Sequence, residues 1–229
     1  TSNNHTINPF IYKDAGYATL TDLVPVVQVA RGPTVIAVNP QVPIYSMKDL
    51  ITYSQVKPIS YGSIGVGSAA HLVGECLKPV IGAKYDHVPY KGGAPAVFDA
   101  VAGHIPLVMS SLASLGPYIK SGKLRALGLS SKVRSEVSPQ IPTIAEQLDP
   151  NFDINFWVGI WAPIATPENI VQKINADISK ALQDPETKTS FTNAGITVRT
   201  MGQQQFAKYV REEIARYKVI AGKAGITPQ

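Results

Sequence analysis

The sequence has little cysteine, little charge and no long hydrophobic run. Only one of its 229 residues is a cysteine, Cys76, so a disulfide-bonded scaffold is excluded. Charged residues make up 16% and hydrophobic residues 45%, a balance that excludes a disordered chain. No stretch approaches the ~20 consecutive apolar residues that a membrane-spanning helix needs. The length fits one large domain or two small ones.

Basic residues are in excess but scattered. The 21 lysines and arginines exceed the 16 acidic residues, for a net charge of +5, yet no basic run is longer than two residues. A nucleic-acid groove would concentrate these charges, so we expect no nucleic-acid partner. The excess favours a small anionic ligand instead.

Strand-like and helix-like stretches alternate along most of the chain. Val26–Ala30 and Thr34–Val38 flank Gly32-Pro33 and predict two strands or one broken strand. Further strands are expected at 59–61, 85–88, 105–109 and 124–129, and helices at 46–54, 68–81, 95–103 and 112–120. Ser46 and Asp49 suggest a capping box, and Pro95 a first helical position. This alternation predicts an α/β fold with a parallel sheet and helices on its faces.

The last third of the sequence is mainly helical. A strand at 155–162 precedes helices that start at Thr166-Pro167-Glu168 and Asp184-Pro185-Glu186. After a strand at 196–199, Thr200 is expected to cap a final helix. One face of that helix would carry Phe206, Val210, Ile214 and Tyr217.

Three loops follow strands of the predicted sheet and are candidates for a ligand site. They are Gly62–Ser68, Pro89–Ala94 and Ser110-Ser111. Ligands of open α/β sheets bind at the carboxyl ends of the strands. The first two loops are rich in glycine and lead into helices, where unpaired backbone N–H groups and the helix dipole favour an anion. Ordinary tight turns are the alternative explanation.

A nicotinamide-dependent oxidoreductase is the rival function. Gly65-x-Gly67 follows a strand and opens a helix, Ala70 takes the third small position, and Asp86 follows in the sequence. His71, one turn after Ser68, either faces a ligand or donates to a backbone carbonyl. The four histidines lack metal-ligand spacing, and no nucleophile elbow is present, so we expect no metal, no cofactor and no catalysis.

Several segments resemble one family, the extracytoplasmic solute receptors of the tripartite tricarboxylate transporter type, also called Bug receptors. The most specific are Tyr61-Gly-Ser-Ile-Gly-Val-Gly-Ser68 and His87-Val-Pro-Tyr-Lys-Gly-Gly-Ala-Pro95. Shorter matches occur at 122–127, 142–146 and 162–167, and the resemblance extends from Ser2 to Pro228.

The resemblance implies a periplasmic-binding-protein-like fold of two α/β domains that close on a small carboxylate. Residues 1–38 and 160–229 would form the first domain and 39–159 the second. No segment matching the family's first βαβ unit precedes Thr1, so we expect the chain to be a fragment with an incomplete first domain.

The resemblance also suggests which residues bind the ligand. Ser2 and Asn3 would contribute from the first domain. The second would contribute Ser63, Gly65, Gly67, Ser68, His71, Tyr90, Gly92 and Gly93 at the carboxylate, and Ser110 and Ser111 at the distal end. Many members carry an aspartate where Ser110 and Ser111 stand, so this chain is expected to prefer a di- or tricarboxylate or an aromatic acid over an amino acid. The implied protein is a periplasmic monomer that delivers its ligand to membrane permease subunits or to a sensor kinase.

Overall fold

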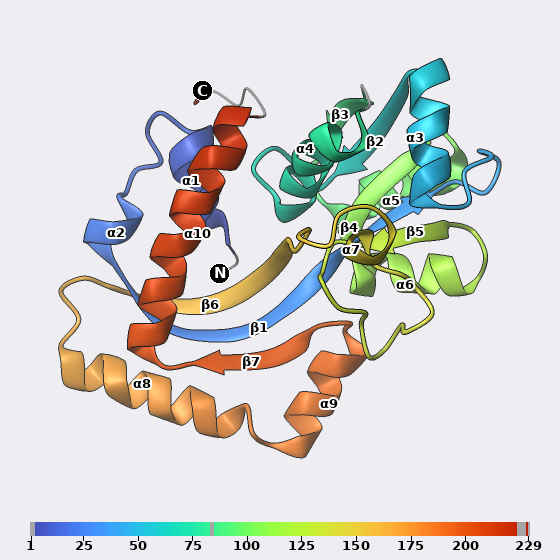
Figure 1. The fold of residues 1–229 in the computed structure, drawn as a ribbon. Coiled ribbons are helices and arrows are strands. Elements are labelled where there is room, and N and C mark those ends of the chain that lie inside the picture. The colour runs from blue at the N-terminus through green and yellow to red at the C-terminus, as the bar shows by residue number, and fades with distance from the viewer. Residues whose placement is uncertain (1–2, 83–84, 224–227, 229) are drawn as a thin grey trace. The chain divides into compact units, whose positions relative to one another are not determined.

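The chain divides into two compact units. The computed structural model describes residues 3–82, 85–223 and 228 (Figure 1). Gly32–Asn155 form one unit, here called the central unit, and Thr1–Arg31 together with Phe156–Gln229 form the terminal unit. The domain boundaries predicted from the sequence, after residues 38 and 159, lie a few residues further along the chain and stay a prediction.

The central unit contains a mixed sheet in the order β3-β2-β4-β1-β5. β2 runs parallel to β3 and to β4, whereas β1 runs antiparallel to both β4 and β5. The strands are β1 (Leu23–Val38), β2 (Ile59–Ser63), β3 (Tyr85–Pro89), β4 (Leu107–Ser111) and β5 (Arg125–Leu129). The sheet is therefore mixed, with parallel pairing at β2, β3 and β4 and antiparallel pairing at β1, as expected for a parallel-rich sheet. The alternation of strands and helices predicts that the strands of successive βα units run parallel. β1 comes before these units in the sequence and lies between β4 and β5, so the alternation does not predict its direction.

β1 is one continuous strand rather than two. It pairs with β7 through Gln28–Arg31 and with β4 through Thr34–Val38. Gly32 and Pro33 lie between these two sets of pairings. A proline is tolerated there because no ladder hydrogen bond is required from it.

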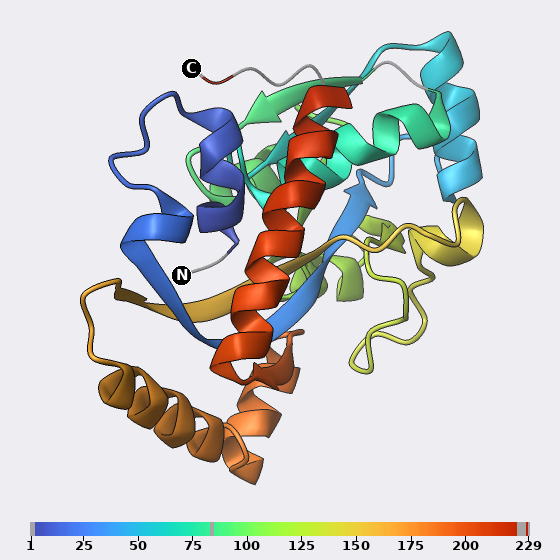
Figure 2. The same ribbon diagram turned by 60° about the vertical axis from the view of Figure 1, so that its left-hand side comes forward.

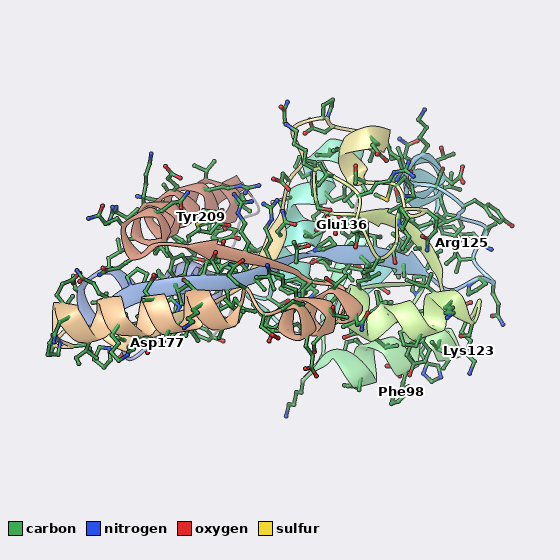
Figure 3. The ribbon with its side chains drawn as sticks, turned by 90° about the horizontal axis from the view of Figure 1, so that it is seen from below. Phe98, Lys123, Arg125, Glu136, Asp177 and Tyr209 are labelled. Carbon is green, nitrogen blue, oxygen red and sulfur yellow. The ribbon has the colours of Figure 1, made fainter. Side chains whose placement is uncertain are left out.

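Helices cover both faces of the central sheet. Ile36 and Val38 pack with residues of α3 and α4 on one face, and Val35 and Ala37 pack with residues of α5 and α6 on the other. This alternation follows from the period of two in a strand. The helices are α3 (Met47–Val56), α4 (Ala69–Ile81), α5 (Gly93–Ala102), α6 (Leu112–Lys120) and α7 (Ile144–Gln147). Figure 3 labels Phe98, an exposed residue on the outer side of α5.

Two helix starts in the central unit differ in detail from the prediction. Ser46 Oγ accepts the N–H of Asp49, but the Asp49 carboxylate accepts the N–H of Tyr45 rather than that of Ser46, so the capping box is incomplete. Pro95 is the third residue of α5 and not the first. It fits there because the N–H groups of a first helical turn have no intrahelical acceptor.

The terminal unit packs two helices against opposite faces of its strands. Trp157 of β6 (Asn155–Pro163) packs on Phe206 of α10 (Gln203–Lys223), and Ala162 lies with Val171 of α8 (Glu168–Ala181). The remaining elements are α1 (Asn4–Ile11), α2 (Thr19–Asp22), α9 (Pro185–Asn193) and β7 (Thr197–Met201). Figures 1 and 2 show α1 beside α10, with which it makes direct contacts. Among the described residues, no helix is both long and apolar enough to cross a bilayer.

Two expectations for the terminal unit are wrong. The N-cap of α8 is Pro167 rather than Thr166, and no side chain caps that end. Thr200 belongs to β7 and does not cap α10. In each case a short capping pattern in the sequence predicted the wrong first residue of the helix, because α8 begins only at Glu168 and β7 continues to Met201.

Candidate anion-binding site

The three candidate loops meet at one edge of the central sheet. β2, β3 and β4 are parallel, so their carboxyl ends lie on the same side, and each leads directly into a helix. The backbone N–H of Tyr90 donates to the carbonyl of Ser63 at 3.0 Å, which joins the first two loops. A Cβ atom placed on Gly93 would lie 3.7 Å from Ile64 Cγ2 and 3.8 Å from Ser110 Oγ. All three loops are therefore in contact.

Three helices begin at this edge. Their N-caps are Ser68 for α4, Gly92 for α5 and Ser111 for α6. The first-turn N–H groups of a helix have no intrahelical acceptor and carry a partial positive charge. Gly92 caps α5 without a side chain, and its φ of +145° is one that other residues rarely adopt. The arrangement provides N–H donors for an anion without a charged side chain.

Two predicted ligand contacts, Ser63 and Ser68, use their hydroxyl groups within the first loop. Ser63 Oγ accepts the N–H of Gly65 at 3.1 Å and lies 2.6 Å from His87 Nε2. Ser68 Oγ donates to the carbonyl of Gly65 at 2.7 Å and accepts the N–H of His71 at 3.2 Å. In this structure both hydroxyls shape the loop.

His71 and His87 form a stacked pair beneath the first loop. Their ring centroids are 4.2 Å apart. His71 is 6% exposed, and its Nδ1 accepts the N–H of Gly67 at 3.2 Å. It therefore accepts from the backbone, whereas the sequence suggested either a ligand contact or donation to a carbonyl. Burial lowers the pKa of His71, and burial together with the neighbouring His71 and Lys78 lowers the pKa of His87 to about 3.

Tyr90 is likewise occupied within the unit. Its hydroxyl donates to Asp99 Oδ2 at 2.7 Å, while its N–H is taken by Ser63. Burial and the Asp99 carboxylate raise the pKa of Tyr90 to about 12. Tyr90 therefore lies where the sequence predicts, but its donors face other residues of this unit.

Ser110 differs from the other serines. It is 4% exposed, and within the described part of the chain its Oγ makes no hydrogen bond to another residue, although the oxygen itself is not fully buried. Ser111 Oγ, by contrast, accepts the N–H of Ser114 at 3.3 Å and lies 3.0 Å from Ser114 Oγ. Ser110 is next to Gly93 at the start of α5, close to the residues predicted for the carboxylate.

Of the two residues predicted from the first domain, the structure describes one. Ser2 lies outside the described residues. Asn3 is buried in the terminal unit as the N-cap of α1, and its Nδ2 donates to Tyr217 Oη at 3.3 Å. Its amide is thus paired within its own unit.

Sequence reasoning missed two residues that shape the site. His87 contacts Ser63 from the adjacent strand, a pairing that no local spacing signals. Glu75 lies one turn after His71 on α4, and this i, i+4 spacing was a usable signal. Among the described residues, no cluster of histidine, cysteine, aspartate or glutamate could hold a metal ion.

Comparison with known proteins identifies the family. A family model described as the tripartite tricarboxylate transporter family receptor matches residues 1–226. The chain belongs to this receptor family. BugT of Bordetella pertussis is 32% identical over 211 residues, which cover 91% of this chain and 65% of BugT. The chain thus spans about two thirds of the length of such relatives.

Solved structures agree with the family assignment. The chain matches the R. palustris protein Rpa4515, determined with adipate, at a TM-score of 0.93 and 31% identity, covering all of this chain and 78% of the other. It matches MatC of Rhodopseudomonas palustris, determined with malate, at a TM-score of 0.83 and 26% identity over 95% of this chain and 76% of MatC. The predicted family and the predicted α/β fold class, a parallel-rich sheet flanked by helices, are confirmed.

The first loop also argues against a dinucleotide site. The N–H group of Gly65 is bonded to Ser63 within the loop, and that of Gly67 to His71 of α4. Asp86 pairs with Ser60 inside the sheet rather than at the carboxyl-end edge. The family is moreover described as one of receptors, not enzymes.

Proposed function

We propose that the protein is an extracytoplasmic solute-binding receptor that holds a carboxylate of a small organic acid where α4, α5 and α6 begin. The observation that carries this proposal is the meeting of three helix N-termini beside Ser110, whose hydroxyl makes no hydrogen bond to another described residue. A carboxylate would accept from first-turn N–H groups and from this hydroxyl.

The expected ligand is a di- or tricarboxylate or an aromatic acid without an amino group. None of the three loops, Gly62–Ser68, Pro89–Ala94 and Ser110-Ser111, contains an acidic residue that could pair with an ammonium group. The adipate and malate present with Rpa4515 and MatC are dicarboxylates of this class.

The cellular role follows from the family. We infer that the protein works in the periplasm as a monomer and delivers its ligand to membrane subunits of a tripartite tricarboxylate-type transporter; presentation to a sensor kinase would use the same site. No nucleic acid, cofactor or catalytic step is involved in this proposal.

A ligand panel tests the site. Adipate, malate, citrate and benzoate are compared with adipamide, aspartate and NAD by thermal shift and calorimetry. Adipamide keeps the length of adipate but not its charge. A ligand at ~100 times its Kd adds about 2.7 kcal/mol, or roughly 5–10 °C in Tm for a protein of this size. Stabilisation by a carboxylate and not by adipamide supports the proposal. The proposal is contradicted if NAD alone stabilises the protein, or if none of the carboxylates does.

A further inference from the structure

Beneath the first loop, a buried carboxylate and a buried imidazole follow one another on α4. We propose that Glu75 is a positioning residue for the anion site: it holds His71 in the tautomer with its hydrogen on Nε2, and the free Nδ1 then fixes the backbone of Gly67. This inference rests on the proposed function, because Gly67 belongs to the loop that would hold the carboxylate.

The hydrogen bond from Gly67 requires one particular tautomer of His71. The N–H of Gly67 points at Nδ1 over 3.2 Å, so Nδ1 must carry a lone pair. A neutral imidazole has one N–H, which must then be on Nε2. Gly67 has a φ of +77°, a backbone conformation that glycine adopts readily and other residues rarely do. The hydrogen bond to His71 helps to hold this conformation.

Glu75 is placed to favour that tautomer. Its Oε1 lies 3.8 Å from His71 Nε2, one helical turn away, and the side chain is only 6% exposed. The carboxylate is itself held in place, because Lys78 Nζ lies 2.7 Å from Oε1 and the Tyr61 hydroxyl donates to the same oxygen at 3.1 Å. A negative charge at this point attracts the hydrogen to Nε2 and leaves Nδ1 free.

The pair also makes the site sensitive to acid. The titratable groups around His71 are Glu75 and Lys78 from α4, Tyr61 from β2, and His87 and Tyr85 from β3. Burial keeps the pKa of His71 below its usual 6.5, so the ring is neutral at pH 7. A proton on Nδ1 would turn the acceptor into a donor that faces the Gly67 N–H. Ligand affinity is therefore expected to fall as the pH drops below 6.5 through the pKa of His71.

Two substitutions of His71 separate positioning from bulk packing. An asparagine places its Oδ1 close to where Nδ1 stands and cannot titrate, whereas a leucine fills the space without an acceptor. His71→Leu is expected to weaken adipate or malate binding about tenfold or more. His71→Asn is expected to restore most of that loss and to flatten the pH profile of affinity below pH 6.5. His104→Asn, which removes an imidazole 71% exposed after α5, is the matched control and should leave the profile unchanged.

A double-mutant cycle shows whether Glu75 acts through His71. Glu75→Gln alone is expected to weaken binding, but in the His71→Asn background it should have no further effect, because no tautomer remains to be set. Nitrogen-15 NMR of the free protein supplies a second measurement. The His71 ring should show a hydrogen on Nε2 in the wild type and a tautomer mixture in Glu75→Gln, with a matching shift of the Gly67 amide.

Each result has a definite meaning. Tighter binding at acid pH, an equal effect of Glu75→Gln in both backgrounds, or a hydrogen on Nδ1 in the wild type would overturn the proposal. If no carboxylate binds the wild type, the proposed function fails, yet the NMR tautomer and the Gly67 amide still decide the positioning role. A variant that does not fold leaves the wild-type pH profile and NMR data as the deciding measurements.

Discussion

Ser110 is 4% exposed, and replacing it with alanine removes a hydroxyl that lies beside Gly93 at the start of α5. If this hydroxyl donates to a bound carboxylate, its loss costs about 1.5–3 kcal/mol, the range for hydrogen bonds to charged groups. That corresponds to a Kd roughly 10–150 times higher. The free energy of unfolding without ligand should change little, because no hydrogen bond joins Ser110 Oγ to another described residue and the oxygen is not fully buried.

The assay is calorimetric titration of adipate and malate into Ser110→Ala, together with urea unfolding of the free protein. Ser121→Ala is the matched control, since the hydroxyl of Ser121 is exposed and donates to the carbonyl of Tyr118 at the end of α6. Unchanged affinity in Ser110→Ala would place the carboxylate elsewhere. A large loss of stability in the free protein would show that Ser110 has a structural partner and would refute the reasoning.

Three further predictions concern stability. Ser68→Ala should lower the free energy of unfolding by about 1 kcal/mol, because Ser68 Oγ caps α4; a change below 0.3 kcal/mol in urea unfolding would count against that role. His87 has a pKa of about 3 in the folded protein, so below pH 6.5 the unfolded chain binds a proton that the folded chain does not. The free energy of unfolding should therefore fall as the pH drops from 6.5 toward 3, by at most about 1.4 kcal/mol per pH unit. The fall should be less steep in His87→Gln. Gly74→Ala should destabilise by about 1–3 kcal/mol because the added Cβ would overlap the Tyr61 ring, whereas Gly202→Ala, with open space around it, should change Tm little; equal effects would be inconsistent with this packing.

The positions of the candidate loops could be predicted from the sequence, but their internal bonding could not. Strand and helix signals along 59–120 are local, and successive βα units are parallel, so the loops after β2, β3 and β4 had to share one edge. The hydroxyl groups of Ser63 and Tyr90 bond to His87 and Asp99, and these contacts form only when the strands and helices pack together.

The direction of β1 is a second feature that local signals do not carry. A strand buried on both faces has the same composition whether it runs parallel or antiparallel, and residues 32–39 are all buried. The start of α1 was missed for a related reason, because it lacks a side-chain cap and contains Pro9. Its stability comes from packing beside α10.

The insertion of β1 between β4 and β5 has a consequence for biosynthesis. Val35 of β1 pairs with Ser110 and Leu129, the second of which leaves the ribosome roughly 90 residues later. At 5–20 residues per second, the apolar segment Val35–Val38 waits about 5–20 s for both of its neighbours. During that time it is a short β-prone stretch with two unpaired edges, the kind of segment that aggregates or binds a chaperone. Nascent chains that end between β1 and β5 should therefore be the most dependent on chaperones.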